Sequence, residues 1–300
     1  ILPIHLDEDE LMAGNGLVEA GTFVAILVGT MAGGLLIRQA DGVAIIAAGI
    51  MAIALAGWLV SFGIPRAPAS APEIRINRNF LSETWKIVSH VRSELSVYRA
   101  ILGISWFWLL GATFISQFPS LAKNVLGADE EVVTLFLALF AVGTAIGSLL
   151  CNWLLKGEVS ARYVPLSAIL MTVAIVDFYL ALGGRVPGPS LLDACTFISL
   201  SQNWRLMADL LALAIAGGFY SVPLYAIMQH DSTPERRSRN VAANNILNAL
   251  FMAVGAGLAG LMLSRNCTVP EVLLAIALVN ALVAGYICTL LPHHLLKTLM

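Results

Sequence analysis

Charged residues are scarce in this chain. Only 12% of its 300 residues are Asp, Glu, Lys or Arg, whereas hydrophobic residues make up 58%. Globular domains carry about 25% charged residues, and a water-soluble domain of this length could not bury so much apolar surface. Lipid must therefore be the solvent for most of the chain, and we predict an all-α integral membrane protein.

Several functional signatures are also missing. The sequence has no G-x-S-x-G, P-loop or HExxH motif, its four cysteines lack metal spacing, and the His-x4-Asp pattern of glycerolipid acyltransferases is absent. Its basic residues are scattered among short loops, which argues against a nucleic-acid partner. We therefore expect no metal, no cofactor and no enzyme within these residues. A Cys195–Cys267 bridge is open from chain position, and packing roles for the cysteines are the alternative.

Eight apolar runs are each long enough to cross a bilayer as a helix, which takes about 20 residues. They lie at about 16–37, 43–63, 99–122, 132–155, 163–183, 206–228, 241–264 and 270–292. Two of them precede a long connection, and six follow it with short connections between them. Six plus six helices around a long central cytoplasmic loop is typical of the major facilitator layout, so we predict a fragment of that fold.

On this interpretation the chain has three parts. Residues 1–64 are the end of an N-terminal transmembrane half, with two helices, and residues 65–98 are the cytoplasmic central loop. Residues 99–300 are the six-helix C-terminal half, which should contain two inverted three-helix repeats. The chain begins Ile1-Leu2-Pro3, without an initiator Met or a signal-peptide pattern, and we interpret it as a piece of a longer protein.

The basic residues predict an orientation. If the 64–98 loop is inside, twelve of the 17 Lys and Arg residues fall on inside segments and five on outside segments. Positive residues favour the cytoplasmic side of short loops, so we expect both ends of the chain to be cytoplasmic. Arg236, Arg237 and Arg239, in a charged loop between two apolar runs, are predicted to be topology anchors rather than catalysts.

The central loop contains an amphipathic run after a proline-rich start. Apolar positions recur every three or four residues, opposite charged ones, which predicts a helix lying at the membrane surface. A surface that docks a partner is the alternative. The apolar positions are Phe80, Leu81, Thr84, Val88, Val91, Leu95 and Tyr98, and the opposite positions include Glu83, Lys86 and Arg92.

Polar side chains inside the predicted spans are candidates for a substrate path. Carboxylates and amides are costly in hydrocarbon and often functional there, although interhelical hydrogen bonding explains amides equally well. We expect Glu19 to lie one turn into its helix, near the cytoplasmic interface. We expect Trp106 and Trp108 to anchor helices at the interface. The path candidates are Glu19, Gln117, Asp177, Asn244, Asn245 and Asn248.

Small residues and prolines are candidates for helix packing or gating. Glycines at four-residue spacing let helices approach closely, and they suit either static contacts or the sliding surfaces of a carrier. Gly217-Gly218 and Pro223 should mark a kink or a broken backbone. The set is Gly21, Gly29, Gly33, Gly143, Gly147, Gly217, Gly218 and Pro223.

Several ordered segments resemble a known family. The segments Gly14–Thr22, Ala25–Gly29 and Ala32–Gly34 of the first helix, Gly217–Leu224 of the sixth, and Ala243–Asn248 of the seventh resemble bacterial lysophospholipid transporters of the major facilitator superfamily. The 229–248 junction looks more like the branch fused to enzyme domains.

The resemblance implies a flippase in the bacterial inner membrane. It would carry lysophosphatidylethanolamine-like lipids inward for reacylation by an acyltransferase/acyl-ACP synthetase, fused or separate. Two other functions stay open from the residues. One is a proton-coupled drug or siderophore efflux carrier of the same superfamily, and the other is the membrane module of a phospholipid-remodelling acyltransferase.

Overall fold

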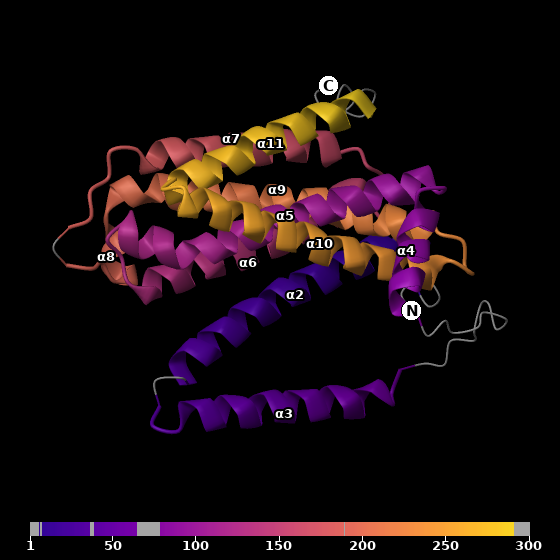
Figure 1. The fold of residues 1–300 in the computed structure, drawn as a ribbon, viewed down its shortest axis with the longest axis horizontal. Coiled ribbons are helices and arrows are strands. Elements are labelled where there is room, and N and C mark those ends of the chain that lie inside the picture. The colour runs from indigo at the N-terminus through magenta and orange to yellow at the C-terminus, as the bar shows by residue number, and fades with distance from the viewer. Residues whose placement is uncertain (1–5, 7, 37–38, 65–78, 189, 291–300) are drawn as a thin grey trace.

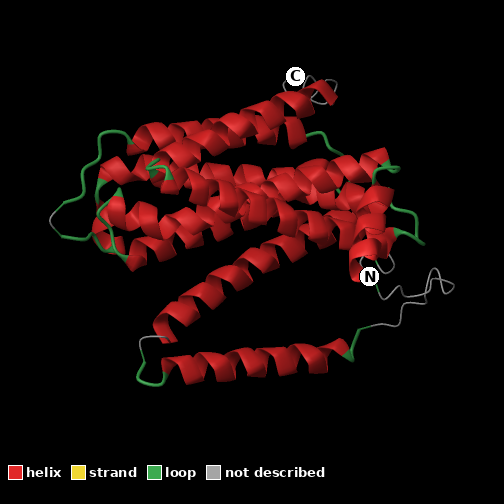
Figure 2. Cartoon of the chain, viewed as in Figure 1, coloured by secondary structure: helices red, strands yellow, loops and turns green. Residues whose placement is uncertain are grey.

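The regular structure of the chain is helical throughout its described part (Figure 2). The computed structural model describes residues 6, 8–36, 39–64, 79–188 and 190–290. Within these residues, eight helices are long and apolar enough to cross a membrane. The prediction of an all-helical membrane protein with eight spans is therefore confirmed.

The spanning helices match the predicted runs closely. Short elements lie between them: α4 (Phe80–Val91), α8 (Ala194–Ser199) and the 3-10 turn η1 (Ser201–Asn203). The spans are α2 (Glu8–Leu36), α3 (Gly42–Ser61), α5 (Leu95–Asn124), α6 (Glu130–Leu155), α7 (Val164–Leu182), α9 (Trp204–His230), α10 (Arg237–Ser264) and α11 (Val269–Leu290).

The first span starts earlier than its apolar run. Helix α2 begins at Glu8, about two turns before the predicted start near residue 16. Acidic residues are favourable at a helix N-terminus because they face its positive dipole end, and the exposed Glu10 in the first turn favours the earlier start. Glu19 consequently lies about three turns into α2, and the expectation that it sits one turn in, near the interface, is wrong.

Six helices form the bundle that contains most of the core. Helices α5, α6, α7, α9, α10 and α11 run side by side along the long axis (Figure 1). Buried phenylalanines pack edge to face through its centre, as in the pairs Phe114–Phe178 and Phe118–Phe136. Helix α9 is the most buried span and contacts α5, α6 and α7.

Glycines bring α6 and α9 into backbone contact. A Cβ at Gly147 would lie 2.1 Å from the Ile215 carbonyl oxygen, and one at Gly218 would lie 2.6 Å from the Ser148 nitrogen. Helix α9 continues without a break through Gly217-Gly218 and Pro223, so the alternative of a broken backbone there is wrong, and the alternative of a kink stays a prediction. Here the small residues serve close packing.

Helices α2 and α3 are set apart from the bundle. The first part of α2 packs against α6 and α9, but its second part slants away toward α3 (Figure 1). Helix α3 is almost fully exposed and, among the described elements, has its main contacts with α2. The first part of α2 is therefore packed against the six-helix bundle, and α2 connects that bundle to α3.

The bundle has two distinct ends. We call the end with the α9–α10 loop, which carries Arg236, Arg237 and Arg239, the arginine end; the start of α2 and helix α4 lie there too (Figure 1). The opposite end carries α8 and the connection from α2 to α3. Alternate connections of the bundle thus meet at one end, as the predicted topology requires.

The amphipathic helix is shorter than predicted. Helix α4 ends at Val91, and a turn closed by Ser93 and Glu94 N–H groups, which donate to the carbonyls of residues 90 and 91, separates it from α5. Leu95 and Tyr98 therefore belong to the first turn of a span rather than to the surface helix. The proline-rich stretch 65–72 lies outside the described residues, and the proposed boundaries at 64/65 and 98/99 stay predictions.

The cysteines do not pair. All four lie in the described part of the chain, and Cys195 and Cys267 are both free, so the structure contains no bridge between them.

Candidate functional site

A buried carboxylate lies where α2 meets the bundle. Glu19 is only 4% exposed, and it lies on the face of α2 that also buries Asn15 and Phe23, whereas Leu17, Val18 and Gly21 are exposed. The Ser221 hydroxyl of α9 lies nearby, but neither it nor Glu19 Oε1 has a hydrogen-bond partner among the described residues. A buried polar group without a partner is costly, so this pair is a candidate for binding something.

Tyr225 connects this carboxylate to the asparagines of α10. Its hydroxyl accepts a hydrogen bond from Trp108 Nε1 at 2.7 Å and lies beside the side chains of Asn244 and Asn248. Asn248 Oδ1 accepts from Ser105 Oγ at 2.8 Å, whereas Asn244 Oδ1 is buried without a donor. One asparagine thus bonds between helices and the other retains a free acceptor.

These side chains lie at a common depth. Glu19, Ser221 and Asn248 each lie about ten residues from the arginine end of their helices, which corresponds to roughly 15 Å along the helix axis. That is about half the thickness of a bilayer's hydrocarbon core. We call this group the polar seam; it comprises Glu19, Ser105, Trp108, Ser221, Tyr225, Asn244 and Asn248.

The polar seam is closed toward the arginine end. Gln229 Nε2 donates to Asn15 Oδ1 at 2.7 Å, which joins α9 to α2 below Glu19. A Cβ at Gly16 would lie 3.3 Å from the Ser148 carbonyl oxygen, so α2 and α6 are in near backbone contact there. Leu11 and Met12 are buried one further turn toward that end.

Contacts of α2 stop soon after Glu19 in the other direction. Phe23 stacks on Trp108 with ring centroids 6.1 Å apart, and it is the last buried residue of α2. A Cβ at Gly21, Gly29 or Gly33 would meet nothing within 4 Å among the described atoms. The glycine ridge of α2 is therefore not packed in this conformation, unlike the glycines of α6 and α9.

Two predicted path residues lie elsewhere. Gln117 is buried on the far part of α5 and donates only to Ser116 Oγ at 3.1 Å. Asp177 on α7 accepts from Arg205 Nε at 2.9 Å and lies beside Asp209 on α9. The structure brings Glu19, Asn244 and Asn248 together and leaves these two out, while Asn245 is exposed at the edge of the seam.

The arginines of the α9–α10 loop have partners on α4 and on the turn before α5. Arg236 pairs with Glu94 at 2.9 Å and Arg239 with Glu83 at 3.0 Å, and Asn240 also donates to Glu94. Arg237 donates to the Gln229 carbonyl at 3.1 Å. Beyond their expected role in topology, these side chains tie the start of α10 to neighbouring elements.

Comparison with known proteins identifies the family. A model of the Major Facilitator Superfamily matches residues 5–256. The chain belongs to the major facilitator superfamily. It is 30% identical over 251 residues to the lysophospholipid transporter LplT of Klebsiella pneumoniae subsp. pneumoniae, covering 80% of this chain and 54% of that protein.

Further relatives of this superfamily member are similar in the same way. The chain is 30% identical over 253 residues to LplT of Cronobacter sakazakii (80% of this chain and 54% of that protein) and 29% identical over 250 residues to LplT of Escherichia coli O7:K1 (79% and 54%). The chain spans about half the length of the curated relatives it matches. No solved structure matches it. These relatives are named as transporters, not as enzymes.

Several members of the polar seam are not predicted from the sequence of this superfamily member. Tyr225 and Ser221 are common residues in an apolar run and give no signal until α9 is placed against α2. Trp106 and Trp108 are both predicted to anchor helices at the interface. In the structure both donate hydrogen bonds within the bundle instead, Trp106 to Asn280 at 2.7 Å and Trp108 to Tyr225. Asp209 could have been found, because a carboxylate inside an apolar run stands out.

The seam is suited to binding a cationic or hydrogen-donating group. Two of its unpartnered atoms, Glu19 Oε1 and Asn244 Oδ1, are acceptors, the third, Ser221 Oγ, can donate or accept, and its seven members include no Lys, Arg or His. No three His, Cys, Asp or Glu side chains of the described residues are grouped to hold a metal. The arrangement therefore favours recognition of a small polar group over bond chemistry.

Proposed function

We propose that this chain is the greater part of a carrier that moves lysophospholipids across the bacterial inner membrane. The observation that carries the proposal is the polar seam, a buried path of acceptors where α2 meets the bundle, in a chain whose relatives are named lysophospholipid transporters. The arginine end then faces the cytoplasm, in agreement with its basic loops. Both ends of the chain are cytoplasmic in this arrangement.

The headgroup travels through the seam while the acyl chain stays in lipid. A lysophosphatidylethanolamine headgroup carries an ammonium with three N–H donors, and the seam offers buried oxygens that have no hydrogen-bond partner among the described residues, on α2, α9 and α10. A charge-assisted hydrogen bond is stronger than a neutral one, so Glu19 would be the main contact. A lipid with one acyl chain needs only a narrow lateral opening between the two halves.

The described conformation corresponds to one state of this cycle. Asn15, Gln229 and the α2–α6 backbone contact close the cytoplasmic side, whereas α2 diverges from the bundle on the other side. In the proposed cycle, α2 rocks against α6 and α9 so that the open side alternates. Helices α2 and α3 are then the last two of the N-terminal half.

The product side of the cycle needs a chemical partner. A lysophospholipid delivered to the inner leaflet would return outward unless it were consumed, and reacylation by an acyltransferase/acyl-ACP synthetase would trap it. Such an enzyme, fused to the carrier or separate, is part of this proposal.

Uptake of labelled lysophosphatidylethanolamine by spheroplasts lacking their own carrier tests the proposal, with the full-length protein expressed. We expect Asn244→Ala to reduce uptake by about ten- to 150-fold, because losing a hydrogen bond to a charged group costs about 1.5–3 kcal/mol. Asn124→Ala is the matched control, since it makes the same change at an exposed asparagine at the opposite end of α5, away from the seam, and the variant should transport normally. Normal uptake by Asn244→Ala would remove the seam from the path.

A second candidate function is supported by the position of Glu19. Proton-coupled efflux carriers need a buried titratable group away from the interface, and the burial of Glu19, about three turns into α2, supports such a role. If the protein exports drugs or siderophores, efflux should depend on the proton gradient and fail in Glu19→Gln. Export of such compounds without lysolipid uptake would replace the first proposal with this one.

A further inference from the structure

Helix α4, the turn after it and the first turns of α5 carry an exposed tryptophan and three exposed basic side chains. Trp85 is 70% exposed and Leu95, just beyond the helix, is 55% exposed. The cations between and beside them, Lys86, Arg92 and Arg99, are also exposed. We call these five residues the α4 outer face. An exposed aromatic side chain among unpaired cations needs an explanation in a chain that has so few charges.

The acidic residues of the same segment are turned away from this face. Glu83 pairs with Arg239 of α10, and Glu94 pairs with Arg236 of the α9–α10 loop, so both carboxylates already form ion pairs. Lys86, Arg92 and Arg99 form no ion pair within the described residues. The outer face therefore keeps three uncompensated positive charges, although the segment as a whole is nearly balanced.

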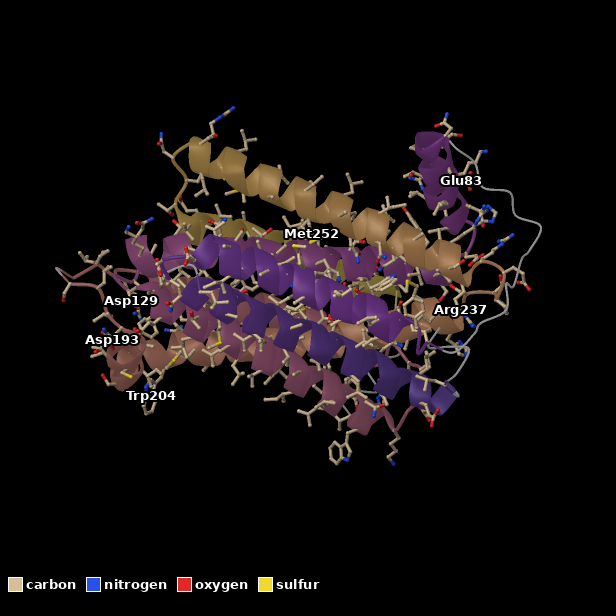
Figure 3. All side chains as sticks on the ribbon, turned by 90° about the horizontal axis from the view of Figure 1, so that it is seen from below. Glu83, Asp129, Asp193, Trp204, Arg237 and Met252 are labelled. Atoms are coloured by element: carbon tan, nitrogen blue, oxygen red, sulfur yellow. The ribbon has the colours of Figure 1, made fainter. Side chains whose placement is uncertain are left out.

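Helix α4 lies across the arginine end of the bundle. Figures 1 and 3 both show it crossing the long axis of the spanning helices, beside the first turns of α5 and α10. Helix α5 enters the membrane directly after it. If α5 spans the bilayer from its first turn, α4 is positioned near the level of the headgroups, where tryptophan and basic side chains are stable.

We propose that the α4 outer face binds the anionic phospholipid surface of the leaflet at the arginine end. Trp85 would insert at headgroup level, and Lys86, Arg92 and Arg99 would contact phosphates and acidic headgroups. The occupant is a lipid surface rather than a protein because the face combines one aromatic residue with spread positive charge, the side-chain types favoured at headgroup level. The inference holds for either transport function proposed above.

Binding to lipid would fix α4 on two sides. Its inner side is held by Arg239 and by packing against α10, and its outer side by the bilayer. The central connection would then be anchored to the six-helix bundle, so that movement of α2 and α3 leaves α4 in place. Each basic residue near an anionic surface contributes about fivefold to binding, from about 1 kcal/mol.

Spin labelling of the reconstituted full-length protein tests this inference. In a cysteine-free background, a label at Trp85→Cys should be more accessible to oxygen than to a soluble nickel chelate in bilayers containing phosphatidylglycerol. A label at Thr233→Cys, exposed in the α9–α10 loop of the same end, should show the reverse and is the aqueous reference. Replacing phosphatidylglycerol by phosphatidylcholine should shift the label at position 85 toward water.

Charge variants separate the electrostatic contribution from simple proximity to the membrane. Lys86→Gln with Arg92→Gln should lower the ratio of docked to undocked label by about 25-fold, as two fivefold contributions combine. Lys123→Gln with Arg265→Gln, exposed at the opposite end, should leave it unchanged. A label at position 85 that is water-accessible in every lipid mixture would overturn the proposal. So would one shielded from both reagents in detergent without lipid, because protein would then cover the face.

Discussion

Replacement of Gly147 by alanine is the sharpest test of how the bundle is built. A Cβ at this position would lie 2.1 Å from the Ile215 carbonyl oxygen and 2.9 Å from two further backbone atoms of Ile215. Optimal contacts lie near 3.5 Å, and a backbone carbonyl cannot rotate away as a side chain can. Helices α6 and α9 would have to separate by about 1 Å or more.

The expected magnitude follows from two opposing contributions. Overpacking a rigid contact costs about 1–3 kcal/mol, and the backbone clash places Gly147 at the upper end of that range. Alanine gains about 1 kcal/mol of helix propensity over glycine, which leaves a net loss of about 2 kcal/mol. In proteins of 150–250 residues such a loss lowers Tm by roughly 4–8 °C.

The glycine ridge of α2 supplies the matched control. Gly29→Ala makes the same chemical change where a Cβ meets nothing within 4 Å, so only the gain in helix propensity should remain. The assay is the apparent Tm of the purified full-length protein in detergent, read from the monodisperse peak after heating. If Gly147→Ala melted at or above the wild-type temperature while Gly29→Ala melted lower, the assigned α6–α9 contact would be refuted.

Three further predictions follow from contacts at the two ends of the bundle. Cysteines at Asn15 and Gln229, joined by a short bifunctional reagent, should stop transport because they hold α2 against α9; continued transport after complete cross-linking would contradict this. Glu94→Gln should loosen the α9–α10 loop, seen as faster hydrogen exchange there, with unchanged exchange in α8. The backbone N–H of Thr196 holds the pKa of Asp193 below its usual 3.8, so this carboxylate stabilises the start of α8 above that pH and stops doing so as pH falls through the lowered pKa. Exchange of the Thr196 amide should therefore accelerate in acid, and Asp193→Asn should abolish the dependence.

The sequence predicts the spans because hydrocarbon imposes a length and a composition that a single chain displays directly. The eight runs appear in the structure with ends displaced by a few residues, as for α5, which starts at Leu95 rather than near residue 99. The larger error, at the start of α2, arose where acidic residues continue a helix that hydropathy alone ends.

The members of the polar seam could be predicted from the sequence only in part. Glu19, Asn244 and Asn248 stand out individually because polar groups are rare in apolar runs. Nothing in the sequence tells that these three meet at Tyr225, or that Asp177 is instead paired with Arg205, since that depends on how helices are rotated about their axes. Common residues such as Ser221 become functional candidates only through the partner that faces them.

The two barriers around the polar seam differ in thickness, and this difference indicates which way the seam opens. Toward the arginine end, α2 is held by Leu11, Met12, the Asn15–Gln229 hydrogen bond and the backbone contact at Gly16. Toward the opposite end, Phe23 follows Glu19 one turn further along the same face of α2, and the half-buried Leu27 packs against the core one turn beyond it. A headgroup arriving from that end meets these two side chains, whereas one arriving from the arginine end has to separate helices over three turns. Because Phe23 stacks on Trp108, and Trp108 donates to Tyr225, moving that ring also frees the hydrogen bonds of the seam itself.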